Sequence, residues 1–193
     1  IYSRVRNSLA IKVIVSTVLL SLVVMGVAGS ALNSQLSAGI KEVNLNTALV
    51  EARSTIFTAE YRFLLAQGEP DSVVQKVVDD VISSATTLTA NENAREVVFI
   101  RSPGNTRVNN YEIASNLLDP TSIPTSLSER VRKKPDLVYQ YTNMNYLTGT
   151  RVKGLAIGQK VQIPNAGQYE MYIIFSLANQ EKTLDLISRS FFL

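Results

Sequence analysis

One uncharged apolar stretch, residues 13–32, constrains the fold of this chain more than any other part of its sequence. It reads VIVSTVLLSLVVMGVAGSAL. At a rise of ~1.5 Å per residue, a helix of this length crosses the ~30 Å hydrocarbon core of a bilayer. The sequence therefore predicts a transmembrane helix over residues 13–32, in contact with membrane lipid.

The charges beside this stretch predict its orientation. Arg4, Arg6 and Lys12 precede it, and residues 1–32 contain no acidic residue. Because basic residues gather at the cytoplasmic end of a span, we expect residues 1–12 to be a cytoplasmic flank. The chain after Leu32 is then extracytoplasmic and the protein belongs to the cell membrane.

A cleavable signal peptide is the alternative, with Ala28-Gly29-Ser30 as its small-residue cleavage site. The apolar run is longer than the apolar core of a signal peptide, which favours a retained anchor. We also expect the chain to be a piece of a longer protein, because it begins without Met and ends in the apolar residues Phe191-Phe192-Leu193.

Charge and composition argue against several classes of function for the outer part. The chain has 19 Lys and Arg and 16 Asp and Glu, so removing the three basic residues before the apolar stretch leaves 16 of each sign. This balance gives no electrostatic support for nucleic-acid binding. The chain contains neither Cys nor His, which removes disulfides, the common zinc sites and His-dependent catalysis. We expect no catalytic residue, metal or cofactor in this segment.

A long helix is predicted to follow the apolar stretch and to end near Gln67-Gly68. Its apolar residues recur every seven positions, at Leu36, Val43, Val50, Phe57 and Leu64. Such a repeat forms either a coiled-coil seam with a second copy of the chain or a face that packs on the domain's own sheet. The sequence leaves both open.

Two shorter helices are predicted farther along. The first has Asp71 or Ser72 as its N-cap and an apolar stripe at Val74, Val77, Val78, Val81, Ile82 and Ala85. The second covers residues 127–134 and begins with the capping-box spacing of Ser126 and Glu129. Its basic run, Arg130, Arg132, Lys133 and Lys134, is read as a solvated face; contact with acidic envelope polymers or lipid head groups is the alternative.

Four segments have the character of strands. Residues 96–101 form a β-branched run that ends at a Ser-Pro-Gly-Asn turn, and residues 102–126 are predicted to form surface loops. Residues 137–142, 155–163 and 169–177 alternate with a period of two. Pro164–Gly167 is predicted to join the last two as a hairpin, and the final strand, apolar on both faces, is expected at the centre of the sheet.

The expected fold is therefore α+β, with a transmembrane helix continuing into a long helix that backs an antiparallel sheet. After Leu177 the helical period returns through Leu184, Ile187 and Phe191, and a second transmembrane helix is expected to start over residues 189–193. Residues 33–188 then form an extracytoplasmic sensor domain between two spans. This arrangement allows a change in the domain to shift one span against the other.

Three segments resemble the actinobacterial MtrB-type sensor histidine kinases. They are residues 8–22 in the first span, Glu51-Ala-Arg-Ser-Thr55 on the long helix and, as the best match, residues 172–184. The resemblance covers both ends of the chain, whereas residues 68–150 match weakly. It implies a sensor with a PDC/Cache-like fold.

The resemblance also implies the function and partners. The protein would be the sensing and signalling region of a homodimeric kinase that phosphorylates an MtrA-like response regulator in cell-envelope and division control. An LpqB-like lipoprotein would bind on the outer face, and the kinase core, with its ATP and Mg, would lie beyond Leu193. The alternative is a membrane-tethered scaffold or adaptor, without kinase activity, whose outer domain binds an envelope lipoprotein.

Cache-like domains bind small molecules on one sheet face. By residue type the candidates are Arg101, Tyr139, Tyr141 and Arg151, which could hold a carboxylate or a planar ligand. The simpler interpretation places the tyrosines in the core and the arginines in solvent.

Overall fold

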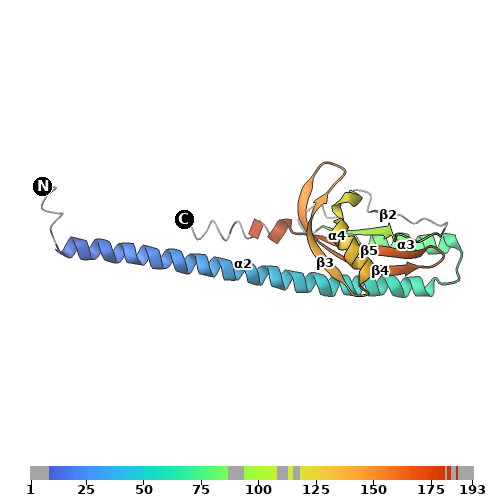
Figure 1. Ribbon diagram of the computed structural model, residues 1–193, viewed down its shortest axis with the longest axis horizontal. Coiled ribbons are helices and arrows are strands. Elements are labelled where there is room, and N and C mark those ends of the chain that lie inside the picture. Colours follow the sequence, from blue (N-terminus) through green and yellow to red (C-terminus); the bar gives the residue numbers. More distant parts are fainter. Residues whose placement is uncertain are drawn as a thin grey trace. The chain divides into compact units, whose positions relative to one another are not determined.

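The computed structural model describes residues 9–86, 94–107, 113–114, 118–180, 182–183 and 186. The chain divides into two compact units, residues 1–43 with 183–193, and residues 44–182. Helix α2 (Leu9–Leu65) belongs to both units (Figure 1). The predicted second span over residues 189–193 lies outside the described residues.

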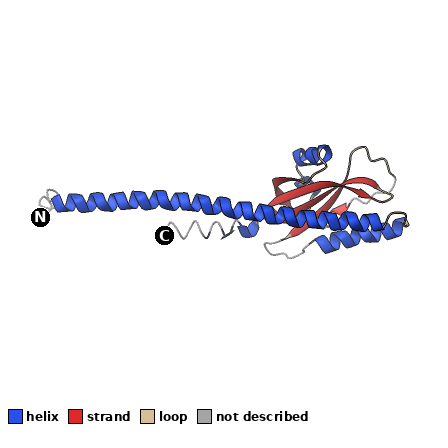
Figure 2. Cartoon of the chain, turned by 90° about the horizontal axis from the view of Figure 1, so that it is seen from below, coloured by secondary structure: helices blue, strands red, loops and turns tan. Residues whose placement is uncertain are grey.

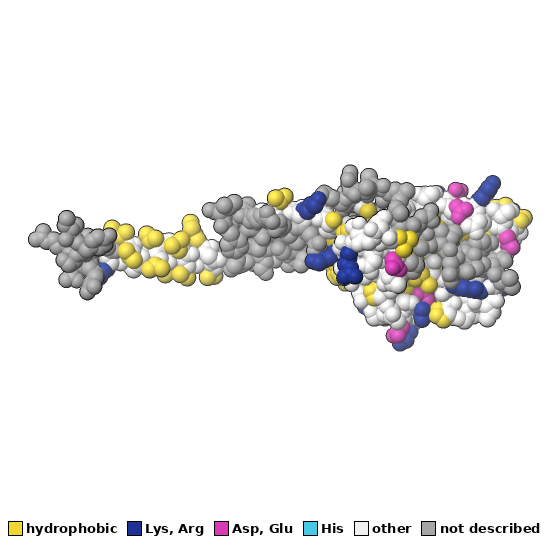
Figure 3. Space-filling model, turned by 90° about the horizontal axis from the view of Figure 1, so that it is seen from above, with side chains coloured by type: hydrophobic (Ala, Val, Ile, Leu, Met, Phe, Trp, Pro, Cys, Tyr) yellow, Lys and Arg dark blue, Asp and Glu magenta, His cyan; other side chains and the backbone are white. Residues whose placement is uncertain are grey.

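In the first unit, the described side chains of α2 cover residues 12–27, and their apolar members are exposed. Their exposed fractions run from 52% at Val15 to 74% at Met25. Figure 3 shows hydrophobic side chains, in yellow, along this part of the helix. The apolar residues are not confined to one side of the helix, because Val13, Ile14 and Val15 are consecutive and all exposed. In the part of the chain that the structure describes, no helix reaches the length and apolarity that a membrane span needs.

The second unit is built on an antiparallel sheet of five strands in the order β2-β1-β5-β4-β3. The strands are β1 (Arg95–Arg101), β2 (Ile113–Ala114), β3 (Val138–Asn145), β4 (Arg151–Ile163) and β5 (Gly167–Ser176). The predicted central place of the last strand is confirmed, since β5 pairs with β1 on one side and β4 on the other. One row of paired residues crosses the sheet through Val97, Ile173, Ile157 and Tyr139.

Both faces of the sheet are covered, which explains why β5 is apolar on both sides. The distal part of α2 and α3 (Asp71–Ala85) cover one face, where Val97, Phe99 and Ile173 are buried. Helix α4 (Thr125–Lys133) covers the other face, over Val98, Tyr172 and Ile174. Figure 2 shows the helices on the two sides of the sheet. The α+β class and the helix-backed antiparallel sheet are thus confirmed.

Small residues let α2 lie close to the sheet. Its buried side chains include Ala48, Ala52, Ile56, Ala59 and Phe63. The ring of Phe63 packs edge-on against Phe99, with ring centroids 6.1 Å apart and planes at 69°. The helix ends at Leu65, and Gly68 follows with a φ of 89°, close to the predicted end.

Helix α3 has the predicted apolar stripe but not the predicted cap. Val74, Val78, Val81 and Ala85 are buried. The helix already begins at Asp71, and Pro70, with a φ of −59°, holds the N-cap position without a side-chain hydrogen bond. The N-cap prediction was wrong because proline presets the backbone for helix entry. The Asp71 carboxylate instead accepts a hydrogen bond of 2.9 Å from the Asn165 amide.

Helix α4 also starts earlier than predicted and without a capping box. Its N-cap is Pro124, again without a side-chain hydrogen bond. Ser126, the predicted cap, lies inside the helix, and its hydroxyl is 3.0 Å from Gln140 Oε1 on β3. The capping-box prediction was therefore wrong, because the Ser126 hydroxyl bonds to Gln140 on a neighbouring strand and not to the backbone at the start of the helix. The loops predicted over residues 102–126 are interrupted by β2 and by the short 3-10 helix η1 (Pro120–Ser122).

The predicted hairpin between β4 and β5 is confirmed at residues 164–167. Asn165 and Gly167 have positive φ angles of 62° and 90°. The Asn105 amide donates to the carbonyls of Ala166 and Gln168 at 2.8 and 3.0 Å, which fastens the hairpin to the turn after β1. A Cβ at Gly167 would lie 2.7 Å from Asn105 Oδ1, so both the backbone angle and this contact require glycine.

Candidate functional site

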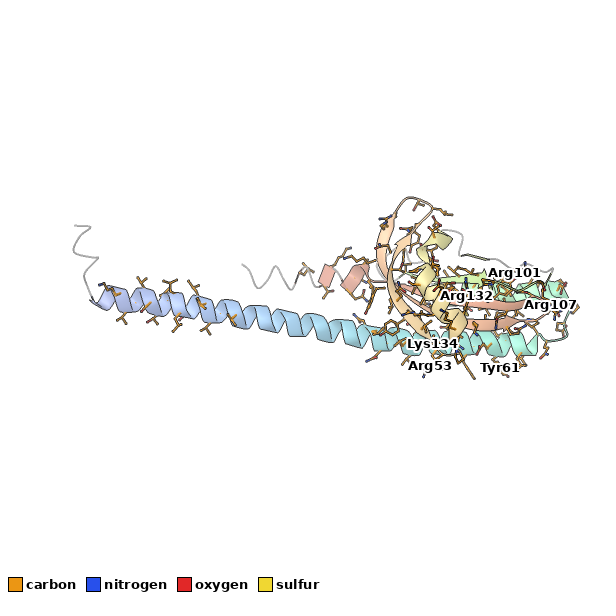
Figure 4. All side chains as sticks on the ribbon, in the orientation of Figure 1. Arg53, Tyr61, Arg101, Arg107, Arg132 and Lys134 are labelled. Atoms are coloured by element: carbon orange, nitrogen blue, oxygen red, sulfur yellow. The ribbon has the colours of Figure 1, made fainter. Side chains whose placement is uncertain are left out.

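A buried carboxylate joins α4 to the centre of the sheet. Glu170, on β5, is fully buried. Its Oε1 accepts a hydrogen bond of 2.6 Å from Arg132 Nε, and its Oε2 accepts bonds from Ser128 Oγ at 2.7 Å and Tyr172 Oη at 2.6 Å. Ser128 and Arg132 lie one turn apart on α4, so this cluster ties the helix to β5. Arg132 is labelled in Figure 4.

The cluster is closed around its carboxylate, while the side chain of Arg132 is 40% exposed. Both Glu170 oxygens are occupied, and the guanidinium of Arg132 balances the buried charge. Burial, reinforced by the hydrogen bond to Glu170, raises the pKa of Tyr172 well above its ordinary value. We interpret the Glu170 cluster as a clamp that positions α4. Sequence reasoning missed it, although a glutamate inside an apolar strand is a signal for a paired buried charge.

The four predicted ligand residues do not meet at one site. Arg101 ends β1 and pairs in register with Tyr169, whereas Tyr139 lies on β3 and is level with Ile173. Strands β5 and β4 lie between them. At ~4.8 Å per strand, β1 and β3 are about 14 Å apart across the sheet.

Their side chains have separate surroundings. Tyr139 and Tyr141 lie two residues apart on edge strand β3 and are 40% and 51% exposed. They point to the same face of the sheet that α2 covers over the inner strands β4 and β5. Arg151 donates through Nε to Asn145 Oδ1 at 2.9 Å, beyond the tyrosines along the β3–β4 pair. Arg101 donates through Nη2 to the carbonyl of Arg107, and its Nε is buried without a hydrogen-bond partner in the described part of the chain.

The predicted seam residues lie on the surface of the second unit. Val50, Phe57 and Leu64 are 71%, 69% and 64% exposed, and Tyr61 and Leu65 extend the same surface. At ~100° per residue, this apolar stripe lies about 160° around the helix from the face that packs on the sheet. Helix α2 does pack on its own sheet, but through Ala52, Ile56 and Ala59 and not through the heptad residues. The side chains of Leu36 and Val43 lie outside the described residues.

The basic run of α4 is divided between structural contacts and solvent. Arg130 donates to the carbonyl of Tyr139, and Arg132 pairs with Glu170. The carbonyl of Arg132 also accepts a hydrogen bond of 3.2 Å from Lys160 Nζ. Lys133 and Lys134 are exposed, as predicted for a solvated face. The two arginines therefore help to fasten α4 to the sheet.

Among the described residues, no group of acidic side chains is arranged to hold a metal ion. No protein-family model matches the chain, and no curated protein matches it.

Proposed function

We propose that this chain is the extracytoplasmic sensing and transmembrane signalling region of a two-component sensor histidine kinase. The observation that carries the proposal is the surface of α2. Exposed apolar side chains cover it in the first unit, and a separate apolar stripe follows it in the second. These two surfaces suit a membrane anchor and a contact with a second copy.

The anchor is inferred from residues 13–32. Large apolar side chains exposed all round a helix are unfavourable in water, at about 25 cal/mol per Å² of apolar surface. A bilayer removes that cost and needs no partner helix. The sequence continues without charge from Val27 to Leu32, and the basic residues before Val13 favour a cytoplasmic N-terminus.

The homodimer is inferred from the apolar stripe. Val50, Phe57 and Leu64 follow a heptad repeat, which two parallel helices can bury between them. Two copies anchored in one membrane with the same orientation present their α2 helices in parallel. The stripe lies opposite the sheet-facing side, so pairing would leave the core of each domain intact.

The kinase assignment depends on the resemblance to the MtrB-type family. A helix-backed antiparallel sheet is compatible with the PDC/Cache-like sensor that the resemblance implies. ATP and Mg would be used by a kinase core beyond Leu193. An MtrA-like response regulator would accept the phosphoryl group, and an LpqB-like lipoprotein would bind the outer domain.

The proposal is tested on the complete reading frame that contains this chain. We expect it to encode a second span and a kinase core with a phosphoacceptor His, and membranes holding the product to incorporate phosphate from labelled ATP. Transfer of that phosphate to a response regulator is the decisive readout. A product that lacks phosphorylation and captures an envelope lipoprotein would overturn the kinase assignment and support the adaptor alternative.

A further inference from the structure

A small hollow with a cationic lining lies between α2 and α3, the two helices on one face of the sheet. Its volume is about 240 Å³, and its polar lining consists of Ser54, Thr55, Thr58, Arg62, Ser84 and Arg95. None of these residues belongs to the Glu170 cluster, the apolar stripe or the four predicted ligand residues. Figure 2 shows α2 and α3 running side by side.

One of the two arginines is fixed by the protein. The side chain of Arg95 is 17% exposed. Its guanidinium donates to the carbonyl of Ala85, at the end of α3, and pairs with the carboxylate of Glu51. Arg95 therefore contributes a held positive charge at the wall of the hollow, partly offset by Glu51.

Arg62 is the free cation of the hollow. It lies in the last turn of α2, and its guanidinium has no hydrogen bond or ion pair with any residue that the structure describes. It also lines an adjoining, larger hollow of about 730 Å³ that contains Glu69 and Asp80. Those two acids disfavour an anion in the larger hollow, so an anion bound to Arg62 is directed toward the smaller one.

The hydroxyl groups are compatible with an oxygen-rich ligand. Thr55 and Thr58 donate to carbonyls of their own helix, at 2.9 and 2.8 Å, and so present hydroxyl oxygens. Ser54 forms no side-chain hydrogen bond within the described residues, and Ser84 has one long bond of 3.2 Å to Val81 O. The two serines can therefore donate to a ligand.

We propose that this hollow binds a small oxyanion, a carboxylate or phosphate group, with Arg62 as its main ligand. The guanidinium offers paired N–H donors that match such a group, and Arg95 adds a second charge. The volume suits an inorganic ion or an acid of few carbons, since sites for drug-sized ligands begin near ~300 Å³. A bound anion would link α2 to α3. Whether this binding acts as a signal rests on the proposed function, in which α2 is the helix that enters the membrane.

The test measures anion binding to the complete chain in lipid nanodiscs. Inorganic phosphate and acetate are titrated separately by calorimetry at constant ionic strength, which distinguishes the two ligand classes. We expect at least one of them to bind at a single site. Arg62→Gln should weaken that binding about tenfold or more, because a charge-assisted hydrogen bond is lost.

Arg53→Gln is the matched control. Arg53, labelled in Figure 4, is exposed on the same helix, and nine residues at ~100° each place it about half a turn from Arg62. The Arg53→Gln variant should bind the anion as tightly as the unaltered chain does. Absence of binding by both anions, or equal loss in the two variants, would overturn the inference. Kinase activity is measured separately, so failure of the proposed function leaves this result interpretable.

Discussion

At the scale of single residues, buried polar groups decide how the sheet is covered. Glu170 is the clearest example, because one fully buried carboxylate accepts hydrogen bonds from Ser128, Arg132 and Tyr172. A buried charge of this kind is expensive to leave without its partners. Together with the contacts of Ser126 and Arg130 to β3, these hydrogen bonds fix the position of α4 on the sheet.

Glu170→Gln should destabilise the second unit by about 2 kcal/mol, because the amide nitrogen cannot accept the hydrogen bonds that a carboxylate oxygen accepts from the buried cluster. The measurement is urea unfolding followed by circular dichroism. Glu129→Gln, an exposed change on the same helix, should alter stability by less than ~0.5 kcal/mol. Equal stability of the two variants would show that the Glu170 cluster does not clamp α4.

Tyrosine ionisation should limit stability in alkali. Burial, and to a lesser extent the nearby charge of Glu96, raises the pKa of Tyr146 to about 12 from its ordinary value of 10.0. The folded protein then holds this proton more tightly than the unfolded chain does. The resulting stability is complete below pH ~10 and is lost as the pH rises toward ~12.

Tyr146→Phe should therefore reduce the fall in unfolding free energy between pH 10 and 12, measured by urea unfolding at each pH. Tyr61→Phe, which alters an exposed tyrosine on α2, is the control and should keep the original pH dependence. If both variants follow the unaltered chain, Tyr146 ionisation does not contribute.

At the scale of elements, α2 has three distinct sides. One side carries alanines and packs on the sheet, a second carries hydroxyls and Arg62 beside α3, and the third is the apolar stripe. A single helix thus serves the core, the proposed anion site and the proposed dimer. The heptad residues are exposed because a different set of α2 residues, centred on Ala52 and Ile56, packs on the sheet.

Phe57→Glu should abolish dimer formation while leaving the domain folded. Phe57 is 69% exposed, so a charge there disturbs only a contact with another molecule. Dimerisation is measured by cross-linking and mass in nanodiscs, and folding by circular dichroism. Ala59→Glu places the same charge on the buried face, where Ala59 is 1% exposed, and should unfold the domain. A folded, dimeric Phe57→Glu variant would exclude the stripe as the dimer contact.

At the scale of the whole molecule, the proposed function needs α2 to connect a membrane to the sheet domain. The helix runs from Leu9 to Leu65 and belongs to both units. Any change that moves the sheet face of α2 is then transmitted along a single element. Under the proposed function, the apolar first part of the helix would anchor the protein and the three-sided second part would take part in sensing.

Leu20→Arg should weaken membrane retention, since an arginine at the centre of a span costs about 3 kcal/mol. The unaltered chain is expected in the membrane fraction after carbonate extraction, and the variant is expected partly in the soluble fraction. Leu65→Arg is the matched control, because Leu65 is equally exposed but lies in the second unit. Identical extraction of all three chains would contradict the anchor.

Elements with a strong periodicity could be predicted from the sequence. The valine stripe of α3, the alternating strands β4 and β5, and the central place of β5 all follow from local patterns of apolar residues. Helix caps were less predictable, because Pro70 holds the N-cap position of α3 and Ser126 bonds to Gln140 on β3 instead of capping α4. Local propensity cannot report a partner that arrives through tertiary packing.

Which side of each element contacts which neighbour depends on the folded arrangement and could not be predicted from local patterns. The heptad of α2 is visible in the sequence, but its exposure depends on alanines occupying the sheet contact. The four predicted ligand residues stay apart because the sheet order separates β1 from β3, and residue type carries no information on strand order. The buried cluster of Glu170 and the proposed anion site of Arg62 arise in the same way, since burial and the approach of a second helix are properties of the folded chain.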